Sequence, residues 1–340
     1  MKNLIVSFKN LSLRSIRSKK GTLQSISPFQ VMVHKEIADH IRSWRFLILI
    51  ALILLTFIAS MYVSLRNINA VLNNSNDPNH VLLYLKLFTT TDNSIPPFHV
   101  FINFLGPLLG IGLGFDAINT EKNNGTLIRL MAQPVYRDNL LLAKFVSALI
   151  VITTLFLSLS LLMIGGGLLL TGVRMEPQEL LRILAFIVFT ILYVSFWLSL
   201  SILLSVKCKQ AATSALTAIG IWLFFTVFFP IIINLIVKSF LPNPNFLSQQ
   251  EIAKYNEMIF SILRVAPGQL YSDATTTLLV PSVRSLGPIT MEQLAGAIPS
   301  SLPFKESLLI VWPQLSGLLS VTVVCFALSY YLFMRREIRS

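Results

Sequence analysis

Charged residues are scarce in this chain of 340 residues, where Asp, Glu, Lys and Arg together make up 12%, while hydrophobic residues reach 54%. A soluble domain carries about 25% charged residues. The composition therefore excludes an ordinary globular protein in water. It favours a polytopic membrane protein whose apolar runs approach the roughly 20 residues that cross a bilayer.

Cysteine is nearly absent too. Cys208 and Cys325 lie at or inside apolar runs, and no second Cys or His stands at metal-ligand spacing from either. This argues against a disulfide framework or a zinc site. The order of His34, Glu36 and His40 also differs from the H-E-x-x-H pattern that places two zinc ligands on one helix face. We therefore expect no metal site.

Motifs for catalysis are missing as well. The sequence contains no G-x-x-x-x-G-K-[ST] phosphate loop, no G-x-S-x-G and no H-E-x-x-H. Any ATP hydrolysis linked to this protein must occur on another polypeptide, so we expect no enzymatic activity and no cofactor on this chain. The apolar runs also lack Asp, Glu, Lys and Arg in their central parts, whereas ion-coupled carriers usually need them.

The net charge of +12 does not indicate nucleic-acid binding, because the basic residues flank apolar runs instead of lining a soluble face. Most of the 27 Lys and Arg residues fall in the N-terminal segment, in 117–144, in 206–212 and in the C-terminal tail. The positive-inside rule then places these parts and both termini in the cytoplasm.

Six apolar runs predict an all-α integral membrane protein. The expected spans cover about 46–65, 98–116, 141–170, 183–205, 213–236 and 307–334. Residues 171–182 are expected to form a short loop. The extracytoplasmic segments are then 66–97 and 237–306. The second contains stretches of helical spacing, for which we expect short helices at the outer leaflet, with a small extracellular cap as the alternative.

An amphipathic pattern over 28–45 precedes the first span. Apolar residues recur at helical spacing from Val33 to Trp44, which predicts an elbow helix that lies in the membrane plane and turns into span one. Its candidate functional residues are Lys35, Glu36, Asp39 and the interface anchor Trp44. The basic segment 1–27 is either a cytoplasmic tail or a basic surface helix.

Two features of the spans predict close helix packing. Gly106, Gly110 and Gly114 repeat every four residues and form one small-residue stripe on span two. The stripe could face a second copy of the protein or another helix of the same protomer. Span five is aromatic and is interrupted by Pro230, and its packing or pathway candidates are Phe224, Phe225 and Phe228.

The segment 119–144 between spans two and three contains more polar and charged residues than a short connection between spans needs. An amphipathic stretch opens at Gly125, preceded by an asparagine as the expected N-cap, and Leu127 and Leu130 share one of its faces. Pro134 ends the stretch, because the residue before a proline avoids the α region. This predicts a short cytoplasmic helix whose apolar face contacts either a partner protein or the membrane surface.

The same segment resembles the signature between spans two and three of ABC-2 type transporter permeases. The pattern E-x-x-x-G-T-L-x-x-L-x-x-x-P-x-x-R-x-x-x-L-x-x-K is carried by Glu121, Gly125, Thr126, Leu127, Leu130, Pro134, Arg137, Leu141 and Lys144. The K-E-I-x-D-x-I-R-S run at 35–43 is similar to the N-terminal elbow of that family. The long segment 237–306 resembles the subgroup with permeases of nitrous-oxide-reductase maturation and gliding motility.

This resemblance implies that 46–340 is a six-span permease domain working with two ATPase subunits, which bind ATP and Mg²⁺, and with a second permease copy or a paralogue. It implies that spans two and five of the two copies face each other. The helix at 125–133 would couple to the ATPases, and Glu121, Arg137 and Lys144 would fix its ends by charge pairing.

The expected function is therefore the transmembrane subunit of an ATP-driven exporter in the cell membrane (plasma or inner), surrounded by lipid. One alternative is an ABC-type mechanotransmission complex that acts on an extracytoplasmic partner without bulk transport. A self-contained channel or secondary carrier is a further alternative, disfavoured by the charge-free centres of the spans.

Overall fold

The computed structural model of the chain describes residues 27–72, 82–89, 95–131, 136–240, 249–281 and 302–335. Within these residues every regular element is a helix. Six helical spans are long and apolar enough to cross a membrane. This confirms the predicted all-α fold with six transmembrane helices.

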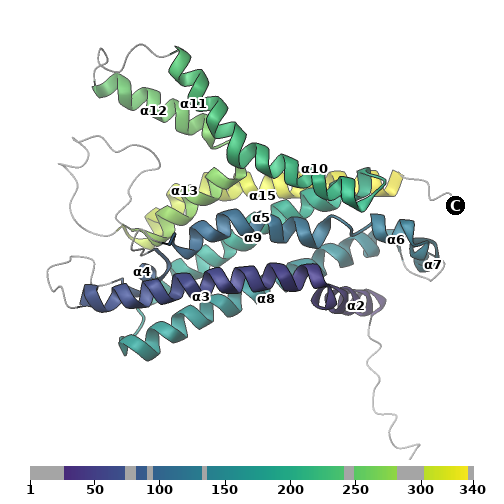
Figure 1. Cartoon of the computed structure of the whole chain (residues 1–340), viewed down its shortest axis with the longest axis horizontal. Helices are drawn as coiled ribbons and strands as arrows, with labels where there is room; N and C mark the ends of the chain where they lie inside the picture. Colours follow the sequence, from purple (N-terminus) through teal and green to yellow (C-terminus); the bar gives the residue numbers. More distant parts are fainter. Residues whose placement is uncertain are drawn as a thin grey trace, which may run out of the picture.

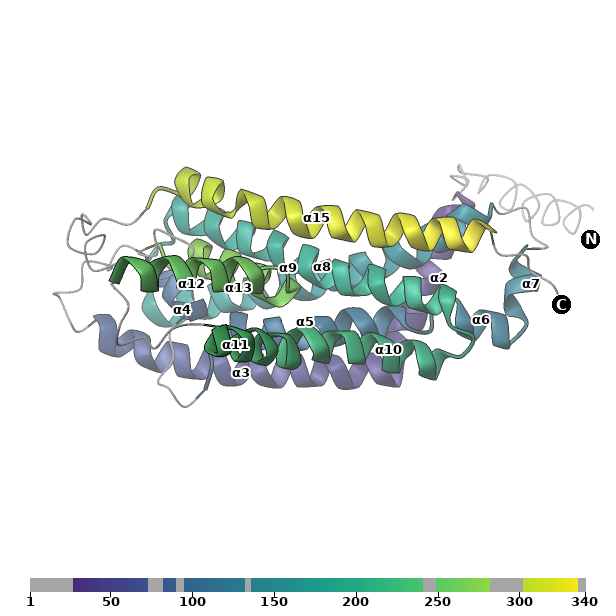
Figure 2. The same ribbon diagram turned by 90° about the horizontal axis from the view of Figure 1, so that it is seen from above.

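The six spans form an elongated bundle (Figures 1 and 2). They are α3 (Trp44–Leu72), α5 (Phe98–Gly114), α8 (Arg137–Thr171), α9 (Pro177–Lys207), the run α10–η1–α11 over 211–240, and α15 (Phe304–Arg335). The start of α2 and the end of α15 lie at the same end of the bundle as α6 and α7, whereas α4 lies at the opposite end (Figure 1). We call these the inner and the outer end, following the predicted orientation.

The start of α9 corrects one sequence prediction. The helix begins at Pro177, inside the predicted loop 171–182, and Pro177 is well suited to a first turn because its φ is already helical. Glu179 and Arg182 therefore lie in the helix, and they are only 1% and 0% exposed. A hydropathy reading ends a span at such charges, but here the helix continues because neighbouring elements bury and hydrogen-bond them.

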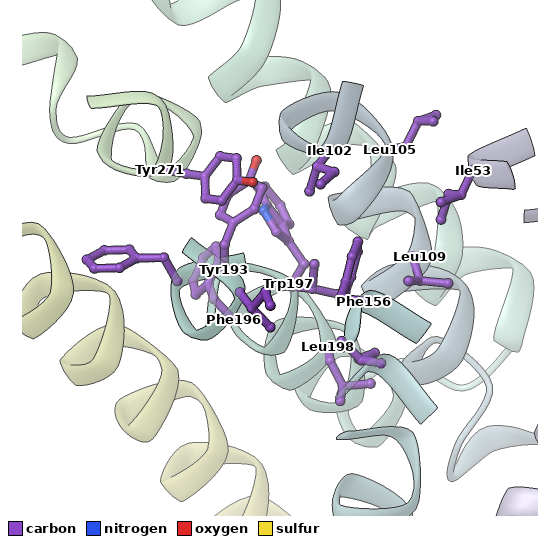
Figure 3. Packing of buried hydrophobic residues seen from close by; sticks show 14 of the residues in the cluster. Ile53, Ile102, Leu105, Leu109, Phe156, Tyr193, Phe196, Trp197, Leu198 and Tyr271 are labelled. Atoms are coloured by element: carbon purple, nitrogen blue, oxygen red, sulfur yellow. The ribbon is translucent and has the colours of Figure 1, made fainter. Parts of the chain in front are cut away.

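The core of the bundle forms around α9, the most buried of the six spans. The predicted glycine stripe of α5 packs against it. A Cβ added at Gly110 would lie 2.6 Å from Val194 O, and one at Gly114 would lie 3.0 Å from Leu198 O. Only glycine allows the two backbones to approach this closely. The stripe thus packs within one protomer, and Figure 3 shows the aliphatic and aromatic side chains that fill the core beside it.

Span five is built differently from the others. It consists of α10 (Ala211–Leu223), a π-helical turn η1 (Phe224–Phe228) and α11 (Phe229–Phe240). The π-turn ends two residues before Pro230, whose missing N–H prevents a regular α-helical bond at this place. Figure 1 shows α11 leaning away from the bundle, with α12 folded back beside it. Phe224 and Phe228 are exposed, and Phe225 is half-buried, so their role in a pathway stays a prediction.

The predicted extracytoplasmic segments contain short helices. α4 (Leu83–Thr89) is almost entirely buried, and α12 (Gln249–Leu263) precedes α13 (Pro267–Leu279). α13 packs against α9 and α15 within the bundle. The rings of Tyr193 on α9 and Tyr271 on α13 stack with their centroids 4.5 Å apart, and both are visible in Figure 3. α13 is therefore a part of the core and not a separate cap.

Replacing Gly110 by alanine should destabilise the bundle. The new methyl group would meet the backbone oxygen of Val194 at 2.6 Å, so α5 and α9 must separate, at a cost of about 1–3 kcal/mol. The apparent melting temperature in detergent measures this loss. Gly165→Ala in α8 is the matched control, because a Cβ there meets nothing within 4 Å. Equal melting temperatures for the two variants would contradict the packing role of the stripe.

Candidate functional site

The predicted elbow segment contains α2 (Pro28–Arg42), a helix distinct from span one. The side chain of Ser27 accepts a hydrogen bond from Gln30 N, and the side chain of Gln30 accepts one from Ser27 N, which closes a capping box. The chain turns to an extended conformation at Ser43 and re-enters a helix at Trp44, which is 74% exposed. The sequence therefore forms α2 as a separate helix, which packs mainly against α8.

Lys144 of α8 is the centre of a buried ionic cluster at the inner end. Its Nζ atom lies 2.9 Å from Glu36 Oε2 of α2 and 2.7 Å from Glu121 Oε1 of α6 (Asn119–Asn123). All three residues are less than one-tenth exposed. An ammonium group shared between two carboxylates is strongly held in such surroundings. The contact joins three segments that are far apart in the sequence.

Lys35 extends the cluster toward the surface. Its Nζ lies 2.9 Å from Glu36 Oε1 and 3.1 Å from Asp39 Oδ2, and it reaches Glu121 Oε1 at 3.8 Å. Two lysines and two glutamates thus alternate, so that each buried charge has a neighbour of opposite sign. Three elbow candidates, Lys35, Glu36 and Asp39, thus meet two coupling candidates, Glu121 and Lys144, in one site.

The carboxyl of Glu36 is held in its charged form. Burial would raise its pKa, but the charge and hydrogen bond of Lys144, together with the hydrogen bond of Lys35, outweigh burial and keep the pKa below the ordinary 4.5. Burial would also lower the pKa of Lys35, yet Glu36 and Asp39 hold that pKa above the ordinary 10.5. Because the pKa of Glu36 is depressed, its contribution to stability is complete above pH 4.5 and is lost as the pH falls below it.

A second ion pair fastens the start of span one to the end of span two. Arg45 Nη1 donates to Asp116 Oδ2 at 2.8 Å, and the guanidinium carbon lies 4.9 Å from the centroid of the Phe115 ring. Both residues lie at the edge of an apolar span, where one arginine can pair with a carboxylate and stack on an aromatic ring at the same time. The pair adds a further link between the elbow region and the segment after α5.

The predicted coupling helix is α7 (Thr126–Met131). Gly125 separates it from α6 with a φ of 67°, a left-handed conformation that favours glycine. Asn124, the expected N-cap of the coupling helix, instead lies at the C-cap of α6, because the chain still has to turn at Gly125. Thr126 Oγ1 donates to Glu121 O at 3.1 Å. The segment therefore consists of two short helices, α6 and α7, joined by a turn at Gly125 that lies next to the ionic cluster.

The other predicted coupling residues have different surroundings. Leu127 is 3% exposed and belongs to the hydrophobic core. Arg137 begins α8, and its guanidinium carbon lies 5.6 Å from the centroid of the Phe333 ring of α15. The side chain of Leu130 and the whole of Pro134 lie outside the described residues, so their roles stay predictions.

A pocket of about 520 Å³ lies between α2, the start of α3 and the segment after α5. Side chains of both charge signs line it, among them Asp39, His40, Arg45, Asp116 and Arg129. Burial lowers the pKa of His40, which favours its neutral form. In the described part of the chain, no group of three or more His, Cys, Asp or Glu side chains could hold a metal ion.

The sequence analysis assigned charge pairing to Glu121, Arg137 and Lys144 without naming partners. The structure pairs Glu121 with Lys144, and it adds Glu36, which the sequence analysis connected with neither. A signal for this contact was present. Glu36 stands next to Ile37 and three residues after Val33, on or beside the apolar face of the amphipathic helix. A carboxylate on such a face indicates a buried cationic partner, because an isolated buried charge is too costly.

Removing the central cation should destabilise the inner end strongly. Lys144→Met leaves Glu36 and Glu121 buried with less compensation, which costs about 3–5 kcal/mol for a broken buried pair. Thermal unfolding in detergent measures the loss. The triple variant that adds Glu36→Gln and Glu121→Gln should recover part of it, since no uncompensated charge remains. Lys122→Met, at an exposed position of the same α6, is the control, and a loss equal to that of Lys144→Met would refute the assignment.

Comparison with known proteins identifies the family of the chain. Residues 30–338 match the family described as ABC-2 family transporter protein. Over 147 residues, 42% of this chain and 52% of the relative, the sequence is 30% identical to a protein of Pseudomonas aeruginosa named "Probable ABC transporter permease protein NosY". It is 29% identical over 151 residues, 43% of this chain and 53% of the relative, to a protein of the same name from Stutzerimonas stutzeri.

In both cases the chain spans about half the length of the curated relative that it matches. The family match, in contrast, covers nearly the whole chain and includes most of α2, all six spans and the helices of the outer end. The chain is therefore a multi-pass membrane protein that belongs to the ABC-2 transporter family.

Proposed function

We propose that this protein is the transmembrane permease subunit of an ATP-driven exporter. The observation that carries the proposal is the Lys144 cluster, which ties α2, the α6–α7 segment and span three into one unit at the inner end. A segment that receives force from a motor must be fixed to the spans that it moves, because a loosely attached loop would absorb the movement. Membership of the ABC-2 family and the permease names of the two relatives support the same function.

ATP hydrolysis is assigned to a separate ATPase subunit, since this sequence has no phosphate loop. In this proposal ATP and Mg²⁺ bind to that partner, and α7 docks on it. The pocket beside α7 and α2, with charges of both signs, supplies further polar contacts for the docked surface. Closure of the ATPases would push α7, and the ionic cluster would carry the push into α2 and α8.

The proposed assembly has two ATPase subunits and two permeases, which are either two copies of this chain or this chain and a paralogue. The complex would lie in the plasma or inner membrane with both termini in the cytoplasm. The exposed apolar faces of α3, α8 and span five fit contact with lipid or with a second permease, since large apolar side chains there include Leu55, Leu169 and Leu235.

Mechanotransmission to an extracytoplasmic partner is the second candidate function. It is favoured by the outer elements, because the α11–α12 pair projects from the bundle (Figure 1) and α13 packs against two spans. Such a construction could pass movement to a bound partner. Export that persists after removal of any extracytoplasmic partner would argue for the exporter.

Gly125→Val should uncouple the permease from its motor while leaving the membrane domain folded. A β-branched residue is strained at a φ of 67°, although a Cβ there has open space, so the turn between α6 and α7 must change and α7 must reorient. We expect the co-purifying ATPase to be lost, or its ATP hydrolysis to become independent of transport. Purification of the tagged protein in gentle detergent, with an ATPase assay, measures this.

The matched control is Gly172→Val at the outer end of α8. Gly172 has a φ of 64° and equally open space, so it imposes a similar backbone strain away from the proposed docking site. Gly125→Asn is a conservative variant, since asparagine tolerates the left-handed region. Equal ATPase recovery for Gly125→Val and Gly172→Val would count against the docking role, and a preparation without any ATPase would overturn the proposed function.

A further inference from the structure

Side chains of α9 cap helices at both ends of the bundle, and the first of these caps lies at the inner end. Ser205 Oγ accepts hydrogen bonds from Ile118 N at 3.0 Å and from Asn119 N at 3.3 Å. These N–H groups stand at the start of α6 and have no partner within that helix. The α6–α7 segment is therefore hydrogen-bonded to span four as well as to the Lys144 cluster.

A carboxylate of α9 performs the same role at the outer end. Glu179 Oε1 accepts from Tyr84 N at 2.7 Å, and Tyr84 N belongs to the first turn of α4. A negative charge at a helix N-terminus is favourable because of the helix dipole. Glu179 is 1% exposed, so water cannot replace this bond. α4 is thereby fastened to the outer end of α9.

One turn further along α9, the guanidinium of Arg182 binds two more elements. Nη1 donates to Leu278 O at 3.0 Å and to Ser307 Oγ at 3.2 Å, and Nη2 donates to Leu302 O. Leu278 O is one of the last carbonyls of α13, which lack partners within the helix. Ser307 belongs to the first turn of α15. The positive charge at the C-terminus of α13 again has the sign that the dipole favours.

The middle of α9 is locked to α5 by the glycine stripe. Backbone atoms of Val194 and Leu198 lie so close to Gly110 and Gly114 that a single added methyl group would collide with them. Ser201 Oγ also donates to Ile111 O at 3.2 Å. Sliding of α9 along α5 would break these contacts, so the two spans should move together.

We propose that α9 transmits movement from the α6–α7 segment to the outer end of the bundle. Ser205 makes the contact at its inner end, and Arg182 makes the contacts at its outer end. The inference rests on the proposed function, since the movement is taken to come from an ATPase docked on α7. A push on α6–α7 reaches α9 through Ser205, and α9 carries α13, the start of α15 and α4 with it through Arg182 and Glu179. Ser205 and Arg182 are thus positioning residues that act between the two ends.

The test uses the purified complex of the full chain with its ATPase. Spin labels are placed at Leu169 of α8 and at Val265 before α13, which are 87% and 63% exposed, in a background in which Cys208 and Cys325 are replaced by serine. The distance between the labels is measured without nucleotide and with ATP plus vanadate. ATP hydrolysis is measured on the same samples.

We expect the nucleotide-dependent change in distance to be at least twofold smaller in Ser205→Ala than in the parent protein, with ATP hydrolysis kept within about twofold. Ser199→Ala is the matched control, because Ser199 is also buried on α9 but its hydroxyl donates only to Phe196 O of its own helix. Arg182→Gln should reduce the change similarly, with the exposed Arg174→Gln as its control.

A full distance change in Ser205→Ala, or no change in the parent complex despite active ATP hydrolysis, would overturn the inference while leaving the proposed function intact. A purification that yields no ATPase would overturn both. If Arg182→Gln does not fold, Ser205→Ala and Ser199→Ala decide the question alone, since each removes only one hydroxyl group.

Discussion

The structure depends on one buried ammonium group, that of Lys144, held between the carboxylates of Glu36 and Glu121. None of these charges could be buried alone, because an isolated charge in apolar surroundings is far less stable than in water. Their mutual compensation therefore requires α2, α6 and α8 to stay together. The cluster therefore fixes the geometry of the bundle at the end where the family is expected to meet its motor.

The need of buried polar groups for a partner also explains the contacts at the outer end. The ends of the short helices α4 and α13 leave backbone N–H and C=O groups without partners inside each helix, and these ends are buried within the bundle. Glu179 and Arg182 supply the missing partners from α9. Ser205 does so for α6 at the inner end. Span four is thus the central core helix, and its side chains also cap the ends of α4, α13 and α6. It therefore holds elements at both ends of the bundle in place.

Much of the fold could be predicted from the sequence. The composition and the six apolar runs determine the all-helical membrane fold, because a bilayer allows few other solutions. The spacing of Gly106, Gly110 and Gly114 predicts a close helix contact, but it does not identify α9 as the partner. The loop predicted over 171–182 was wrong from Pro177 onward, since a hydropathy reading treats Glu179 and Arg182 as solvent-exposed charges.

The sequence by itself determined that the chain has six apolar runs long enough to span a membrane, and that 119–144 and 35–43 resemble the coupling and elbow segments of one family. Only the tertiary structure decided which charges meet. Glu36 and Lys144 are separated by 108 residues, and no local pattern specifies a contact across such a distance. It arises because the packing of the spans brings α2 and α8 together, and burial then makes their opposite charges depend on each other.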